Sequence, residues 1–459
     1  MNSFQQIFDA QKQYFSSDIT KPYEWRIEQL NKLETLLTDN AEGFYTALGK
    51  DFKTCYFEQA FEILGLLGTI AHTKAELKNW MRPEQCELKQ LLTDLGHTAF
   101  IHRQPYGVTL IIGPFNSPLI LLLEPAIAAL AAGNTCILKP AASTAHTTSL
   151  FAELIAKYFE PEAVTMVSGN REVVTGLLQL PFDFIFFTGS TNVGRVVMLA
   201  AAENLTPVLL ELGGQNATIV DETANLPDAA EKIGWGFTAL GGQWCVSPGY
   251  VYVHESVADA FVEESKKALI KMYGEDAQKS NDLSKIITEH DVERIMNMVD
   301  TEKIVYGGSF DKAKRYIEPT LVYPSEWTDK IMDGEIFGPV LPILVYSDIR
   351  EAVQIIKSKP KGLAAYIFSR NQATIDYILN SISFGGGCIN QANIHCWMET
   401  MPFGGVGTSG IGRYYGKYGF EALSNPRNIL YSSPDVNIEV IHPPYNEGKL
   451  NAVKAMFKA

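Results

Sequence analysis

The sequence is poor in cysteine and in positive charge. Its six cysteines among 459 residues include no CxxC pair, and so few thiols over so long a chain are not typical of a disulfide framework or a zinc site. The 38 lysines and arginines are outnumbered by 52 aspartates and glutamates, which leaves a formal net charge of −14. This balance argues against a nucleic-acid-binding protein.

Long apolar runs are missing as well. The most apolar segment, residues 118–132, is interrupted by Glu124 and Pro125 and is too short to span a bilayer. The first six residues contain no basic patch followed by an apolar run, as a signal peptide would. No apolar segment follows Asn451. We therefore expect a cytoplasmic protein without a membrane anchor.

The remaining composition predicts a folded α/β protein with more than one domain. Hydrophobic residues make up 46% and charged residues 20% of the sequence, and the length exceeds that of one ordinary core. Helical spacing of apolar residues dominates the first 80 positions. From Val108 onward, short apolar runs alternate with helical patterns, which is typical of parallel sheets covered on both faces. These predicted strands lie at 108–112, 135–138, 163–167, 184–187, 208–210, 250–253, 343–346 and 364–368.

Cys245 is the strongest candidate for a reactive residue. It follows Gly241-Gly242-Gln243-Trp244, and a thiol on a glycine-bounded loop is open to a substrate because the glycines carry no side chains. The attacking form is the thiolate, so such a cysteine is a candidate nucleophile. The alternative is that Cys245 is a small buried hydrophobic residue.

Other polar residues follow predicted strands, where ligands bind in parallel sheets. Asn116 could donate to an oxyanion or simply cap a turn. Lys139 ends a strand, and Glu211 ends a very apolar one, where it is either a desolvated base or a salt-bridged carboxylate. The turn at residues 188–194 offers backbone amides to an anion, although its spacing is not GxGxxG. Glu335 could bind a sugar hydroxyl pair or be a solvated turn residue.

Together these segments resemble the aldehyde dehydrogenase superfamily. Seven motifs occur in the order found in that family: Pro114-Phe115-Asn116, Leu138-Lys139-Pro140, Phe187-Thr188-Gly189-Ser190, Glu211-Leu212-Gly213-Gly214, Gly242-Gln243-Trp244-Cys245, Glu335-Ile336-Phe337-Gly338-Pro339 and Pro402-Phe403-Gly404-Gly405-Val406-Gly407. The ending at residues 414–421, with Pro443-Pro444-Tyr445, is similar to the class-three and fatty-aldehyde branch. The chain departs from that branch at Trp244, where a smaller residue is more usual, and in having no apolar C-terminal anchor.

The resemblance implies a mechanism and a cofactor site. Cys245 would attack the aldehyde carbonyl, the Asn116 amide would bind the oxyanion, and Glu211 would deprotonate the water that releases the acid. The implied cofactor is NAD or NADP, held by Lys139, Gly189, Ser190, Gly194, Leu212, Gly213, Glu335, Phe337, Pro114 and Phe115. His395-Cys396 has no matching ligands at zinc spacing, so we predict no metal site.

The nucleotide preference and the product can be argued from two positions. Many NAD-preferring relatives carry a glutamate three residues after the ribose lysine, whereas this chain has Ala142. The missing anion predicts that NADP is used at least comparably to NAD. Glu211 favours a free acid over transfer to coenzyme A. A coenzyme A-acylating enzyme and a catalytically silent binding relative remain the alternatives.

The resemblance also implies two Rossmann-like parallel-sheet domains plus a small β element. We expect a dinucleotide-binding domain at 1–83 and 104–211, a catalytic domain at 212–395, an oligomerisation element at 84–103 and 425–440, and a C-terminal tail at 441–459. The β element predicts a homodimer. Trp244, Tyr23, Tyr56 and Phe115 indicate an apolar or aromatic aldehyde as the substrate.

Overall fold

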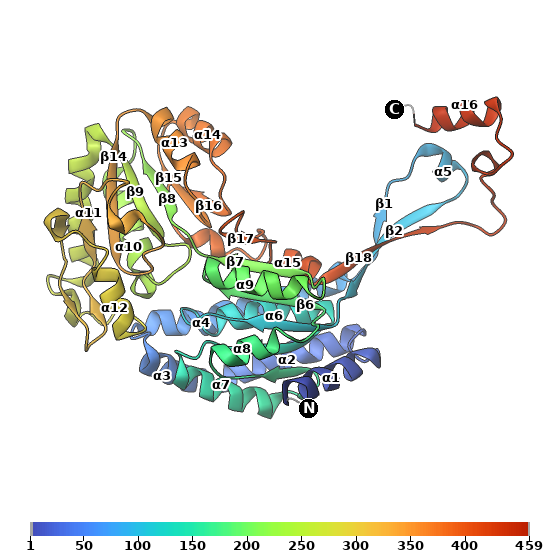
Figure 1. Ribbon diagram of the computed structural model, residues 1–459, viewed down its shortest axis with the longest axis horizontal. Helices are drawn as coiled ribbons and strands as arrows, with labels where there is room; N and C mark the ends of the chain where they lie inside the picture. The colour runs from blue at the N-terminus through green and yellow to red at the C-terminus, as the bar shows by residue number, and fades with distance from the viewer. Residues whose placement is uncertain (1–2, 458–459) are drawn as a thin grey trace.

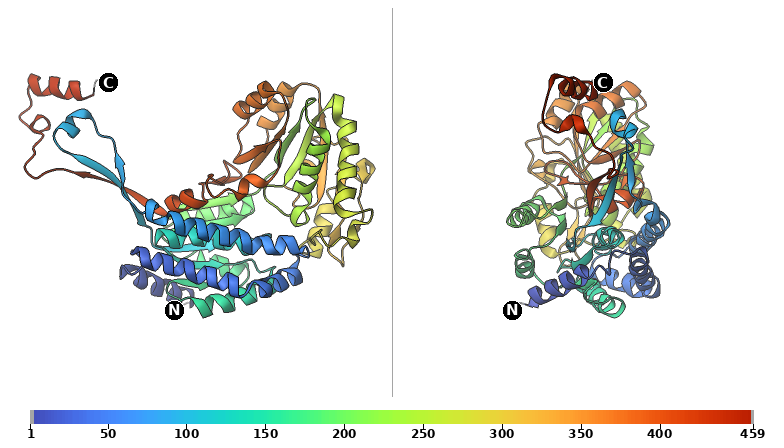
Figure 2. Two further views of the ribbon diagram at one scale, coloured as in Figure 1. Left: turned by 180° about the vertical axis from the view of Figure 1, so that it is seen from behind. Right: turned by 90° about the vertical axis from the view of Figure 1, so that its right-hand side faces the viewer.

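The chain folds into two α/β lobes and a projecting arm, as the computed structural model in Figure 1 shows. It describes residues 3–457, so Met1, Asn2 and the last two residues of the tail lie outside the described residues. The second lobe stands at one end of the first lobe, and the arm leaves the opposite end (Figures 1 and 2).

The first lobe is built on a sheet whose strands, in the described part of the chain, have the order β17-β7-β6-β3-β4-β5. Its strands are β3 (Val108–Ile112), β4 (Thr135–Lys139), β5 (Val164–Met166), β6 (Phe184–Gly189), β7 (Val208–Leu212) and β17 (Gly410–Ile411). All neighbours are parallel except β17 and β7. Each long strand is an apolar run because both faces are covered by helices.

The helices of this lobe fall into two groups. The N-terminal group comprises α1 (Ser3–Ser16), α2 (Tyr23–Asp39), α3 (Ala41–Asp51) and α4 (Tyr56–Trp80), and the helices between strands are α6 (Ile120–Ala132), α7 (Ala145–Tyr158), α8 (Arg171–Leu177) and α9 (Thr191–Ala202). Residues 121–132 of α6 are all buried, because α6 lies between the sheet and the helices α2 and α4. This position explains why its sequence is apolar all round.

The second lobe repeats this architecture around a sheet with the order β10-β13-β14-β9-β8-β15-β16 over the described residues. Its strands are β8 (Asn216–Val220), β9 (Pro248–His254), β10 (Ile304–Tyr306), β13 (Thr320–Val322), β14 (Val340–Tyr346), β15 (Ala364–Phe368) and β16 (Gly386–Ile389). The helices are α10 (Leu226–Thr238), α11 (Ala258–Tyr273), α12 (Glu289–Met296), α13 (Ile349–Lys357) and α14 (Gln372–Ser381), and a hairpin of β11 (Phe310–Asp311) and β12 (Tyr316–Ile317) is added. The predicted α/β class with two parallel-sheet lobes is confirmed.

The arm is an antiparallel sheet with the order β1-β2-β18. It combines β1 (Glu84–Cys86), a short helix α5 (Gln90–Asp94), β2 (Thr98–Pro105) and β18 (Ser424–Tyr431), which follows α15 (Gly416–Ala422). The C-terminal helix α16 (Glu447–Met456) lies beside the arm rather than on a lobe, since Lys89 Nζ is 3.9 Å from the ring centre of Phe457. The division of the chain into functional domains stays a prediction.

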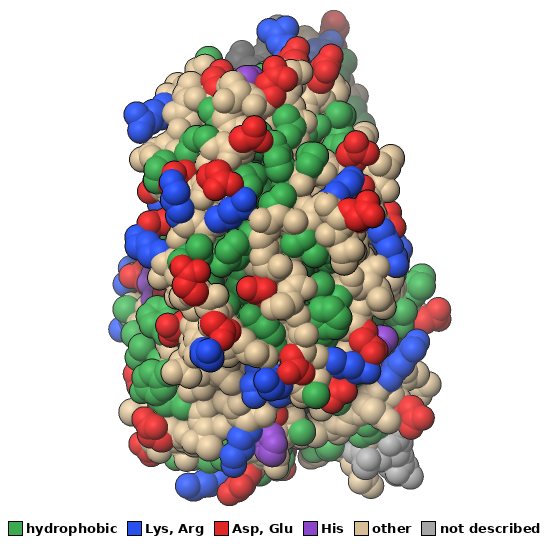
Figure 3. All heavy atoms as spheres, turned by 90° about the vertical axis from the view of Figure 1, so that its left-hand side faces the viewer, with side chains coloured by type: hydrophobic (Ala, Val, Ile, Leu, Met, Phe, Trp, Pro, Cys, Tyr) green, Lys and Arg blue, Asp and Glu red, His purple; other side chains and the backbone are tan. Residues whose placement is uncertain are grey.

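The surface of the molecule carries both acidic and basic side chains. Acidic and basic side chains are interspersed with apolar ones on the face of the second lobe that Figure 3 shows. Among residues 3–457, no helix combines the length and the apolar character that a bilayer span needs.

Candidate active site

Cys245 lies on a loop between α10 and β9 that is bent by three consecutive left-handed residues. Leu240, Gly241 and Gly242 have φ angles of 57°, 64° and 72°. A Cβ at Gly242 would lie 2.2 Å from the carbonyl carbon of Gly338. Glycine is therefore required there both for its backbone conformation and for the close approach of another loop.

Gln243 holds this bend in place through its side-chain amide. Its Nε2 donates to the carbonyl oxygens of Leu240, at 2.9 Å, and Lys285, at 3.0 Å. Its Oε1 accepts from the Ile287 backbone N–H at 2.9 Å. Behind the nucleophile, Asn216 Nδ2 donates to the Cys245 carbonyl at 2.8 Å. The structure of this loop thus explains the residue type at each of Gly241, Gly242 and Gln243.

Two cavities meet at Cys245. One, the strand-end cavity, measures about 310 Å³ and lies beyond the carboxyl ends of β3, β6 and β7. The other, the aromatic cavity, measures about 140 Å³ and is lined by Trp235, Trp244 and Trp397. Cys245 lines both, so molecules held in the two cavities can meet at its sulfur.

The strand-end cavity brings together most of the residues singled out in the sequence. Its lining includes Pro114, Phe115, Asn116, Gly189, Ser190, Glu211, Leu212, Gly213, Cys245, Glu335 and Phe337. Lys139 and Gly194 are not in contact with it. Gly194 packs against Leu212, whose Cδ2 would lie 2.6 Å from an added Cβ. Lys139 ends β4, and its Nζ donates to the Pro140 carbonyl at 2.5 Å.

Asn116 and Glu211 both present polar atoms that no described residue satisfies. Asn116 Nδ2 and both carboxylate oxygens of Glu211 are buried without a hydrogen-bond partner among residues 3–457. Burial raises the pKa of Glu211 well above its usual range, against the opposing charge of Arg413. Unpaired buried polar groups are costly, and here they point to a ligand or a reacting group as the missing partner.

The environment of Cys245 favours the neutral thiol. Burial, followed by the nearby carboxylates of Glu335 and Glu211 and the thiol of Cys396, raises the pKa of Cys245 well above its usual value. The thiolate is the reactive form. Its population in this state is therefore small, and it increases as pH rises or as a positive charge approaches.

The loop at residues 333–339 of the second lobe closes one side of the strand-end cavity. Phe337 has a φ of 53°, and its ring packs edge-on against Phe115 with centroids 5.8 Å apart. Burial raises the pKa of Glu335 to about 7, while the Gly214 N–H and Arg294 act in the opposite direction. Arg294 also donates to the Ile336 carbonyl at 3.0 Å and so holds the Glu335 loop.

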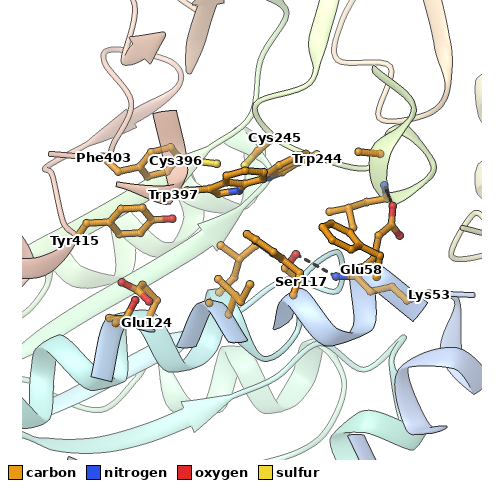
Figure 4. Close-up of a pocket in the computed structure, with 18 of the residues that line it drawn as sticks. Lys53, Glu58, Ser117, Glu124, Trp244, Cys245, Cys396, Trp397, Phe403 and Tyr415 are labelled. Atoms are coloured by element: carbon orange, nitrogen blue, oxygen red, sulfur yellow. Dashed lines mark hydrogen bonds between the residues drawn. The ribbon is translucent and has the colours of Figure 1, made fainter. Parts of the chain in front are cut away.

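The aromatic cavity corrects part of the sequence interpretation. Trp244 lines it, and its ring meets Trp235 at 5.8 Å and 90°. Phe115 lines the strand-end cavity instead, and Tyr23 and Tyr56 line neither. Tyr56 points outward and is 63% exposed. Figure 4 shows Cys245 above Trp397, with Tyr415 and Glu124 together at another side of the cavity.

Sequence reasoning missed several residues of both cavities. Arg294, Tyr414 and Thr188 line the strand-end cavity, and Trp235, Trp397, Glu58, Glu124 and Glu399 line the aromatic one. Most lie within helices or irregular loops whose sequence resembles ordinary core or surface. Only Thr188, which lies in the predicted turn at residues 188–194, had a local signal in the sequence.

Comparison with known proteins identifies relatives along the whole chain. Residues 2–429 match the aldehyde dehydrogenase family. The sequence is 40% identical over 464 residues to a 4,4'-diaponeurosporen-aldehyde dehydrogenase of Staphylococcus aureus, with 100% of each chain covered. It is 37% identical to a dimeric NADP-preferring aldehyde dehydrogenase of Mus musculus, covering 94% of this chain and 95% of that one. A solved structure described as the substrate-bound state of Staphylococcus aureus AldH superposes with a TM-score of 0.97 at 40% identity, with both chains fully covered.

Proposed function

The chain belongs to the aldehyde dehydrogenase family, and on that premise we propose that Cys245 is its nucleophile, Asn116 its oxyanion donor and Glu211 its general base. The reaction is NAD(P)-dependent oxidation of an aldehyde. The observation that carries the residue roles is that all three side chains line one cavity, where Asn116 and Glu211 have unsatisfied polar atoms.

The strand-end cavity suits a nicotinamide dinucleotide. Its lining includes Gly189 and Gly213, and Thr188 Oγ1 is buried there without a partner among the described residues. Glu335 would hold ribose hydroxyls, and Phe115 and Phe337 would flank the ring. Ser190 is the N-cap residue of α9, where backbone amides favour a phosphate. Lys139, although outside the cavity lining, would reach the adenosine ribose. A bound nicotinamide supplies the acceptor for the hydride that leaves the aldehyde carbon.

The side chains of this protein supply the remaining chemistry. The Cys245 thiolate attacks the carbonyl carbon and forms a thiohemiacetal. Asn116 Nδ2 and the Cys245 backbone N–H donate to its oxyanion, and one such donor is worth about 3–4 kcal/mol in other acyl-transfer enzymes. After oxidation, Glu211 takes a proton from water, and the water oxygen attacks the thioester to release the acid and the thiol.

The aromatic cavity supports an apolar or aromatic aldehyde as the substrate. Three tryptophans form its wall next to Cys245. We also propose a homodimer located in the cytoplasm. The dimer is supported by the projecting arm and by the relative named as dimeric.

The residue roles are tested by pre-steady-state kinetics. With Glu211→Gln, mixing enzyme, nucleotide and an aromatic aldehyde should release about one reduced nucleotide per subunit, followed by turnover slowed by roughly 10²–10⁴-fold. Cys245→Ser should remove both phases, whereas the control Cys86→Ser on the arm should keep both. A Glu211→Gln enzyme without a burst, or one with full turnover, would contradict the assignment of Glu211 to thioester hydrolysis.

A further inference from the structure

Helix α4 carries two carboxylates one turn apart, Glu58 partly buried and Glu62 fully buried, that have no role in the proposed reaction chemistry. Glu58 and Glu62 stand four positions apart, so they share one face of the helix. Glu62 is fully buried, at 0% exposure. Each carboxylate accepts hydrogen bonds from a different segment of the active site.

Glu58 binds the loop that carries the nucleophile (residues 239–247, the nucleophile loop). Its Oε1 accepts from the Leu240 backbone N–H at 2.6 Å, and its Oε2 accepts from Ser284 Oγ at 2.6 Å. Leu240 has the φ of 57° described above, a conformation that costs an L-residue roughly 1–2 kcal/mol. An external acceptor on its N–H stabilises this strained bend.

Glu62 binds the loop that carries the oxyanion donor (residues 113–119, the Asn116 loop). Its Oε2 accepts from the backbone N–H groups of Leu119, at 3.2 Å, and Ile120, at 3.0 Å, where α6 begins. Its other oxygen forms a buried ion pair with Lys53. Lys53 Nζ in turn donates to Ser117 Oγ at 3.3 Å, and Ser117 directly follows Asn116.

We propose that α4 fixes the nucleophile loop and the Asn116 loop relative to each other, with Glu58 and Glu62 as positioning residues. Figure 4 shows Glu58, Lys53 and Ser117 on one side of the aromatic cavity, facing the Cys245 loop. A single rigid helix thereby sets the spacing between the sulfur and the amide that must converge on one carbonyl. The inference rests on the proposed roles of Cys245 and Asn116.

The roles of Glu58 and Glu62 can be separated by experiment. Alkylation of a thiol by iodoacetamide forms no oxyanion, so it does not depend on the oxyanion donor Asn116. For Glu58→Ala, the kcat of aldehyde oxidation should fall by about tenfold or more, since a displacement near 1 Å costs up to 10²-fold. The rate of Cys245 alkylation, followed by mass spectrometry, should change as well, because the nucleophile loop sets the exposure and the surroundings of the thiol. Glu58→Gln keeps an acceptor for Leu240 and should bring the alkylation rate back close to that of the wild type. Glu42→Ala, an exposed glutamate of α3, is the matched control.

Glu62→Ala should lower kcat for aldehyde oxidation by about tenfold or more while the alkylation rate stays within about twofold, because only the oxyanion donor is displaced. If this variant does not fold, Glu62→Gln combined with Lys53→Met removes the buried charges together and keeps one acceptor for α6. Nucleotide binding and far-ultraviolet circular dichroism report whether each variant is folded.

The outcomes decide between the alternatives. An unchanged alkylation rate in folded Glu58→Ala would overturn the proposal, and so would equal losses of alkylation and oxidation in Glu62→Ala. If the wild-type enzyme oxidised no aldehyde with either nucleotide, the proposed residue roles would fail. The Glu58 alkylation test would still give its own answer, because it needs neither aldehyde nor nucleotide.

Discussion

At the scale of single residues, Glu124 shows how burial converts an active-site carboxyl into a pH-sensitive group. It is 5% exposed on α6, and burial together with the charge of Glu399 raises its pKa to about 8 against a hydrogen bond from Thr69. The folded state therefore keeps a proton that the unfolded chain loses near its usual pKa of about 4.5. The stability contributed by the protonated form is complete below that value and is lost as pH rises toward 8.

The variant Glu124→Gln tests this loss of stability with rising pH, because glutamine keeps the shape of the side chain but cannot lose a proton. Relative to this variant, the wild type should lose stability between about pH 4.5 and 8, by at most about 1.4 kcal/mol per pH unit, and the difference should level off above 8. Urea denaturation across this range measures the effect, with Glu42→Gln as an exposed control. A constant difference at all pH values would show that Glu124 does not hold a proton in the fold.

Ala142 is the residue that we expect to govern nucleotide choice. It is exposed in the loop between β4 and α7, three residues after Lys139. A carboxylate here would repel a 2′-phosphate and accept from a 2′-hydroxyl. Ala142→Glu should lower kcat/KM with NADP by about tenfold or more and change the NAD value by less than about threefold. Ala142→Gln, which adds size without charge, should leave the ratio of kcat/KM with NADP to kcat/KM with NAD near that of the wild type. Equal ratios for the wild type, Ala142→Glu and Ala142→Gln would refute the argument.

At the scale of elements, the sequence predicts most reliably the strands that are buried on both faces. The apolar run 108–112 matches β3 without an error, because every side chain of that strand is covered. Helix α6 begins at Ile120, inside the apolar segment 118–132, since residues 117–119 form the turn that Glu62 and Lys53 hold. The short strand β17 has no periodicity at all and forms only because Gly410 and Ile411 reach the edge of β7.

The same limit applies to the site. Among the motif residues, Cys245 lies on a loop after Gly241 and Gly242, and Glu211 lies at the end of β7 just before Gly213, so glycines visible in the sequence mark both positions. The wall of the aromatic cavity was only partly predicted because Trp235 comes from α10 and Trp397 from a short 3-10 turn. Only tertiary packing brings the Trp235 ring against both Trp244 and Trp397. Tyr56 was a wrong candidate because an aromatic residue at a helix start carries no sign of which face it occupies.

Trp244 should limit the size of the aldehyde. It lines a cavity of only about 140 Å³ directly beside Cys245. Trp244→Ala widens that cavity, so kcat/KM for two-ring or branched aldehydes should rise by about tenfold, while that for small aliphatic aldehydes should fall, because a methylene group lost from an apolar contact costs up to about 1–3 kcal/mol. A panel of aldehydes assayed with one nucleotide measures kcat/KM for both classes of substrate. Parallel changes for all aldehydes would mean that Trp244 supports the loop and does not select the substrate.

At the scale of the whole molecule, the arm is the part whose shape a monomer does not explain. It projects from the first lobe in Figure 1 and in the left-hand view of Figure 2, and it makes a sheet of its own. Its edge strand β18 pairs only with β2 within residues 3–457, and residues 425–431 of it are exposed. Three apolar side chains are open to solvent there, with exposures of 36% for Ile429, 51% for Leu430 and 48% for Tyr431.

An exposed apolar edge strand is a template for pairing unless another chain covers it. If a second copy does so, the wild-type mass in solution should be twice the 50.8 kDa of one chain. Ile429→Lys with Leu430→Lys places two charges on that edge and should yield a monomer of 50.8 kDa, measured by sedimentation equilibrium. Replacing Leu205, an equally apolar side chain that is 91% exposed on the first lobe, by Lys should leave the dimer intact. A dimeric arm variant, or a wild type that sediments as a monomer, would show that the arm is not the interface, and its exposed apolar strand would then need a different partner.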